Sequence, residues 1–106
     1  MRVTVSHNKN PEDIRKHIDR GVQDIFKGLP IGPVQFTEQQ HAWSGNTLNF
    51  SFNANAGFMS VPIKGFVLVE PKLLTIDVDL PSFLTNLIPE QKMKAAIEGQ
   101  VKGLLT

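Results

Sequence analysis

Strict alternation of apolar and polar side chains over residues 47–54 is the sequence feature that most constrains the fold. The apolar members of this run are Leu48, Phe50, Phe52 and Ala54, and every residue between them is polar. Successive side chains of a β-strand point to opposite faces, so the run predicts a strand with one buried face. A sheet made of such strands needs a second layer to cover its apolar side.

Similar alternation predicts strands over residues 1–6, 34–43, 58–69 and 72–80. Turn-forming residues at 44–46, 55–57 and 70–71 separate the last four strands, so these should form an antiparallel meander. Gly45 and Asn46 are both expected to take a positive φ in the first of these turns. The apolar phase of Val34 and Phe36 differs from that of Trp43, which predicts a β-bulge between them.

Two helices are predicted from apolar side chains at helical spacing. The first begins with Asn10 as cap and Pro11 in the first helical position, carries Ile14 and Ile18, and runs to residue 27. Residues 29–33 should form an irregular connection. The second helical stripe begins at residue 82 and continues to residue 104, and Pro89 either kinks one long helix or separates two.

The predicted order is therefore β-α-β-β-β-β-α, an α+β fold of two layers. One antiparallel sheet should be packed on one face by the two helices, in a single domain over residues 1–106. The arrangement resembles the repeat of the TATA-binding protein or a reduced helix-grip fold. In both of these folds the first strand joins the sheet beside the last one, and such a likeness of fold implies no function.

The strand register follows from the turn after residue 69. If Glu70 and Pro71 are its central pair, residue 69 faces residue 72, and Lys64 faces Asp77 as a cross-strand charge pair. Val61, Ile63 and Val67 then share the helix-covered face with Leu74, Ile76 and Val78.

The same register leaves four large apolar side chains on the outer sheet face: Phe58, Phe66, Leu68 and Leu73. An antiparallel sheet covered on one side is usually polar on the other. This candidate interaction surface therefore predicts a partner, with Lys64, Asp77 and Asp79 as its polar border. The alternative is that a terminus or loop folds over the four residues.

The chain offers little for catalysis. Eleven basic and ten acidic residues give a net charge of +1, so no basic field favours nucleic acid. No cysteine is present, which excludes disulfides and thiolate chemistry. The histidines at positions 7, 17 and 41 have no metal-ligand spacing, and Asp77 and Asp79 are expected on a solvated face. We therefore predict no catalytic, cofactor-binding or metal-binding residue, and no enzymatic activity.

No stretch approaches the roughly 18 apolar residues that a membrane-spanning helix needs. The first ten residues are too polar for the apolar segment of a secretory signal. The expectation is a cytoplasmic protein without a membrane span.

Several short segments resemble one bacterial family. Residues 43–50, WSGNTLNF, resemble the W-x-G-[DN]-T-L-x-F core of the polyhydroxyalkanoic acid system proteins, the granule-region family. Residues 65–69 are similar to its G-x-[IVL]-x-V strand, residues 80–84 to its L-P-x-x-L motif, and residues 97–105 to its I-E-x-x-x-x-x-L-L ending. His7 stands where many members carry a histidine after the first strand. Pro89 and the tract 55–64 depart from the pattern.

The resemblance implies a bacterial protein associated with polyhydroxyalkanoate storage granules, and no catalytic residue can be carried over from it. The expected function is that of a small non-catalytic accessory or binding protein, held at a granule surface or in a homodimer through the apolar sheet face. The alternative is a carrier of a small apolar or acyl ligand between the sheet and the C-terminal helix. A cavity in that layer would favour the carrier.

Overall fold

The computed structural model describes residues 1–27, 35–80 and 82–105. The predicted irregular connection at 29–33 lies outside the described residues. Pro89 separates two helices, as one of the two alternatives predicted. The elements in chain order are β1 (Arg2–Ser6), α1 (Pro11–Lys27), β2 (Gln35–Ser44), β3 (Thr47–Ala56), β4 (Met59–Val69), β5 (Leu73–Asp79), α2 (Ser82–Leu87) and α3 (Glu90–Leu105).

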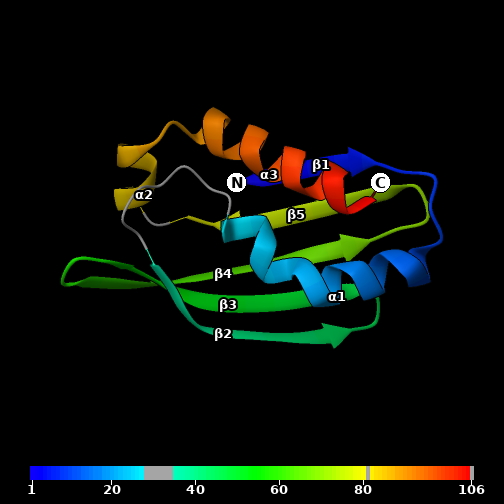
Figure 1. The fold of residues 1–106 in the computed structure, drawn as a ribbon, viewed down its shortest axis with the longest axis horizontal. Coiled ribbons are helices and arrows are strands. Elements are labelled where there is room, and N and C mark those ends of the chain that lie inside the picture. The colour runs from blue at the N-terminus through cyan, green and yellow to red at the C-terminus, as the bar shows by residue number, and fades with distance from the viewer. Residues whose placement is uncertain (28–34, 81, 106) are drawn as a thin grey trace.

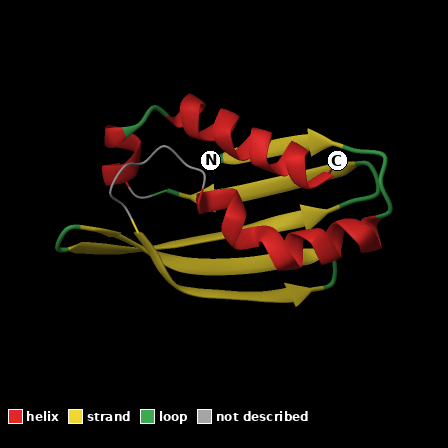
Figure 2. Cartoon of the chain, in the orientation of Figure 1, coloured by secondary structure: helices red, strands yellow, loops and turns green. Residues whose placement is uncertain are grey.

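The five strands form one antiparallel sheet in the order β1-β5-β4-β3-β2 (Figure 1). The predicted meander of β2 to β5 is confirmed, and β1 pairs with β5 as expected. Helices α1 and α3 lie side by side on one face of this sheet (Figure 2). The predicted α+β architecture is therefore confirmed, with an open antiparallel sheet and a helical layer.

Apolar side chains from both layers fill the space between sheet and helices. Among these side chains are Phe50, Phe52, Ile76, Val78 and Ile97, which are all at most 7% exposed. Helix α3 contributes a stripe at a spacing of four residues, made of Met93, Ile97, Val101 and Leu105. This spacing places one side chain of each turn on the same helix face, which explains how α3 buries itself on the sheet.

The sheet register differs from the predicted one by two residues. The turn after β4 is wider than expected, because the Glu70 N–H donates to the Leu73 carbonyl and Val69 pairs with Leu74. Lys64 consequently lies opposite Asp79, so the predicted pairing of Lys64 with Asp77 is wrong. A shift of two residues returns each side chain to the same face, so the predicted buried face is still correct.

The β2–β3 and β3–β4 hairpins contain a β-bulge and two turns with a glycine at positive φ. A register shift between Thr37 and Gln40 confirms the predicted bulge in β2. Gly45 has a φ of +61°, which confirms the prediction for the glycine of the β2–β3 turn. The next turn differs from the prediction, because β3 continues to residue 56 and Gly57, with a φ of +64°, turns the chain together with Phe58.

Helix α1 is joined to the sheet by polar contacts at its exposed flank. Its start is capped as predicted, since the Asn10 Oδ1 accepts from the Glu12 N–H at 2.9 Å. Asp19 Oδ1 accepts from the Trp43 Nε1–H at 2.9 Å and lies 3.2 Å from His41 Nε2. The Arg15 guanidinium lies 4.9 Å from the centre of the Trp43 ring. Trp43 thus links β2 to α1, and it is half-buried at the margin of the core.

Candidate functional site

The sheet face opposite the helices carries three of the four predicted interaction residues close together. Phe66 and Leu68 follow each other on this face of β4. Leu73 lies on β5, diagonal to Leu68 and two residues from its partner Thr75. All three are half-buried. We call Phe66, Leu68 and Leu73 the outer patch.

Thr75 lies in the middle of the outer patch and is only 8% exposed. Its cross-strand neighbours are Leu68 on β4 and Thr4 on β1. A threonine on an uncovered sheet face becomes buried only when larger side chains stand around it. The burial of Thr75 indicates that neighbouring side chains of the outer patch pack around it.

Charged side chains border the outer patch, although not in the predicted pairs. Asp77, opposite Phe66, accepts a hydrogen bond from Arg2 Nε at 3.0 Å. Lys64 and Asp79 face each other on the next row of the same face. A polar rim around an apolar centre is the usual arrangement of a binding surface.

Phe58 lies apart from the other three predicted residues. It occupies the tip of the β3–β4 hairpin, eight residues before Phe66, which corresponds to about 26 Å along an extended strand. Its side chain is 101% exposed, and its neighbour Met59 is 44% exposed. The hairpin extends beyond the rest of the sheet (Figure 1). Its tip is a second apolar feature, separate from the outer patch.

The histidines occupy three separate places in the fold. His7 is buried after β1, His17 is exposed on α1, and His41 lies on β2 beside Asp19. Among the described residues, no three histidines, aspartates or glutamates gather as metal ligands would. None of the described helices is long and apolar enough to cross a membrane.

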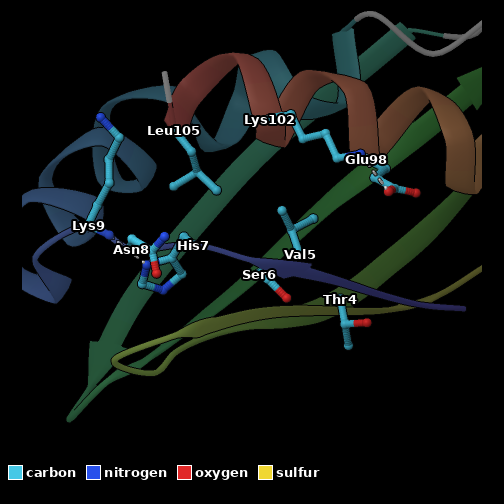
Figure 3. Close-up of a pocket in the computed structure, with 9 residues that line it drawn as sticks. All are labelled: Thr4, Val5, Ser6, His7, Asn8, Lys9, Glu98, Lys102 and Leu105. Carbon is cyan, nitrogen blue, oxygen red and sulfur yellow. Dashed lines mark hydrogen bonds and ion pairs between the residues drawn. The ribbon is translucent and has the colours of Figure 1, made fainter.

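A groove of about 810 Å³ runs between the free edge of β1 and the side of α3 (Figure 3). Six consecutive residues from Thr4 to Lys9 form one wall, and Glu98, Lys102 and Leu105 form the other. Sequence analysis missed this groove, because it exists only once α3 has packed beside β1. The only relevant pattern in the sequence is the alternation in residues 1–6. It predicts a strand, but it does not show that this strand lies at the edge of the sheet.

Comparison with solved structures gives a crystal structure of the quaternary ammonium Rieske monooxygenase CntA in complex with the inhibitor MMV12. The sequences are 14% identical, and the TM-score is 0.42. All of this chain but only 40% of the monooxygenase chain is covered. At this TM-score the likeness carries no argument.

The comparison with curated proteins gives no match. The family comparison gives a match over residues 1–106 to the family described as "Putative polyhydroxyalkanoic acid system protein". The segments that resemble this family in sequence lie on the β2–β3 hairpin, on β4, at the start of α2 and on α3. The match covers the whole sequence, and this chain therefore belongs to the polyhydroxyalkanoic acid system protein family.

Proposed function

We propose that this protein is a non-catalytic binding protein that attaches to polyhydroxyalkanoate storage granules through the outer patch. Membership in the polyhydroxyalkanoic acid system family supports a role in that system. The observation that carries the proposal is the half-exposed apolar surface of Phe66, Leu68 and Leu73 on the sheet face opposite α1 and α3.

The polyester is largely apolar, so contact with it would remove the outer patch from water. Full burial of one such side chain stabilises by about 1.5–3 kcal/mol. The three side chains start half-buried, so each would contribute less than this full amount.

The carrier alternative has less support. The layer between the sheet and α3 is filled by Met93, Ile97 and Val101, each 0% exposed. Of the three described pockets, one opens at the edge of this layer, between β1 and α3, and the other two lie on the outer side of β2 to β4 and beside α1. Because these side chains fill the interior of the layer, we do not propose an internal ligand site.

Co-sedimentation with poly(3-hydroxybutyrate) particles tests the proposal. The double variant Phe66→Ser, Leu68→Ser should keep its fold and lose most of its binding. The control is Gln40→Ser, Ala42→Ser, which makes two serine changes on the same sheet face at exposed positions of β2. This control should bind like the unchanged protein.

Phe58→Ser distinguishes the outer patch from the hairpin tip. Phe58 is fully exposed, so its replacement should leave both the fold and most of the particle binding unchanged. If Phe58→Ser abolishes binding while the double variant retains it, the hairpin tip is the attachment point and the proposed surface is wrong.

A further inference from the structure

The free edge of β1 exposes backbone groups that no described strand satisfies. β1 is the last strand on one side of the sheet. Met1 and Val78 exchange two backbone hydrogen bonds of 2.8 Å, and the His7 N–H donates to the Lys72 carbonyl at 3.0 Å. In an antiparallel pair the residues that bond to the neighbouring strand alternate with those that do not. The N–H and C=O groups of Arg2, Thr4 and Ser6 therefore point away from β5, toward the open side.

The two edges of the sheet differ in their protection against further strand pairing. Natural sheets protect exposed edges with bulges, prolines or covering segments. β2 carries a bulge between Thr37 and Gln40. β1 has neither a bulge nor a proline, and the groove beside it leaves room for another chain.

The end of the groove is held in a fixed conformation by His7. Its Nε2 lies 2.8 Å from the Glu70 carbonyl oxygen, and its Nδ1 lies 3.2 Å from the Lys9 nitrogen. A carbonyl can only accept and a backbone N–H can only donate, so the proton of the imidazole is on Nε2. The imidazole thereby fastens the loop that carries Asn8 and Lys9 to the turn after β4 (Figure 3).

The groove walls specify the side chains of a bound strand. A residue opposite Val5 would point to the helix side, where Val5 and Leu105 are apolar. Residues opposite Thr4 and Ser6 would meet hydroxyl groups on the other side. The Glu98 carboxylate already pairs with the Lys102 ammonium at 3.0 Å. The Lys9 ammonium has no ion pair with a residue in the described part of the chain, so it favours a carboxylate at its end of the groove.

We propose that this groove binds an extended acidic peptide segment of a partner protein, which adds to β1 as a further antiparallel strand. Only a backbone in extended conformation offers donors and acceptors at the spacing of Arg2, Thr4 and Ser6. Recognition by strand addition obtains affinity from main-chain hydrogen bonds and specificity from alternate side chains. The segment should alternate polar and apolar residues and carry Asp or Glu at the Lys9 end.

A phage-displayed library of random peptides provides the probe, with selection on the unchanged protein. Thr4→Val keeps the outward N–H and serves as the matched control, and Thr4→Pro removes this N–H without touching the hydrogen bonds between β1 and β5. Proline is tolerated on an edge strand when its nitrogen faces the open side. Selected peptides should bind Thr4→Pro at least about tenfold more weakly than Thr4→Val, equivalent to about 1.4 kcal/mol. Lys9→Glu should weaken binding, whereas Lys16→Glu on α1 should not.

A second measurement does not depend on how well Thr4→Pro folds. Addition of a selected peptide to the unchanged protein should shift the amide NMR signals of Arg2, Thr4 and Ser6. The proposal is overturned if no peptide is selected, or if the shifts lie away from β1. It is also overturned if sedimentation shows a dimer of the chain alone that Thr4→Pro dissociates, because a second copy would then occupy the edge.

Discussion

Gly65 shows how one residue permits the close packing of three strands. It lies on β4 between Phe50 of β3 and Val78 of β5. A Cβ at this position would stand 2.7 Å from Phe50 Cζ and still closer to the Asp77 carbonyl oxygen. Both contacts are shorter than van der Waals distance, and one involves backbone that cannot rotate away. The Phe50 ring can therefore cover this part of β4 only because residue 65 has no side chain.

Gly65→Ala should lower the free energy of unfolding by about 1–3 kcal/mol, the usual cost of overpacking a core. Urea unfolding followed by circular dichroism measures this loss. Gly99→Ala on α3 is the control, because nothing lies within 4 Å of its added Cβ. Alanine favours a helix over glycine by up to about 1 kcal/mol, so this variant should be as stable or more stable. Equal losses in both variants would contradict the packing described at Gly65.

Truncation of two phenylalanines in the same hairpin should change the free energy of unfolding by very different amounts. Phe52 is 7% exposed and makes an edge-to-face contact with Phe36 at 4.9 Å between ring centres. Phe52→Ala should therefore cost roughly 3–5 kcal/mol. Phe58→Ala at the fully exposed tip should change stability by less than about 0.5 kcal/mol. A loss under about 1 kcal/mol at Phe52 would show that the buried face of β3 is misassigned.

At the scale of elements, the alternation of apolar and polar residues predicts which sheet face a side chain occupies better than it predicts which residue lies opposite on the next strand. Leu48, Phe50 and Phe52 were placed correctly because their parity along the strand decides which face they occupy. The partner of Lys64 was predicted wrongly because parity is unchanged when the register moves by two residues. Only the width of the turn after Val69 separates the two registers, and the residues at that turn fit both.

Trp43 reports on the contact between helix α1 and strand β2. A double-mutant cycle of Asp19→Ala and Trp43→Phe isolates the hydrogen bond from Trp43 Nε1 to Asp19 Oδ1. The bond is exposed, so its coupling energy should be at most about 0.5–1.5 kcal/mol. Trp43 is also the only tryptophan of the chain, so its fluorescence follows the docking of α1 during unfolding. A coupling energy near zero would contradict a contribution of this hydrogen bond to the contact between α1 and β2.

At the scale of the whole molecule, the sequence predicts the layers and most of the outer patch. Short turns order β2 to β5, and the apolar stripes of α1 and α3 require a common sheet face. The position on the outer sheet face could be predicted for Phe66, Leu68 and Leu73. It depends only on parity along the strand and on how neighbouring strands are connected. Phe58 was grouped with them wrongly, because parity contains no information on where a hairpin turns or how far it extends. The groove at β1 could not be predicted, since its two walls meet only through packing between Thr4–Lys9 and α3.

The most direct measurement places a fluorescent probe on each face of the molecule. The chain contains no cysteine, so one introduced thiol is labelled alone. We expect an environment-sensitive dye on Leu73→Cys, in the outer patch, to shift its emission to the blue when the protein binds poly(3-hydroxybutyrate) particles. The same dye on Lys16→Cys, exposed on α1, should keep its emission wavelength in water. A blue shift only at position 16, or binding without a shift at position 73, would contradict attachment through the outer patch.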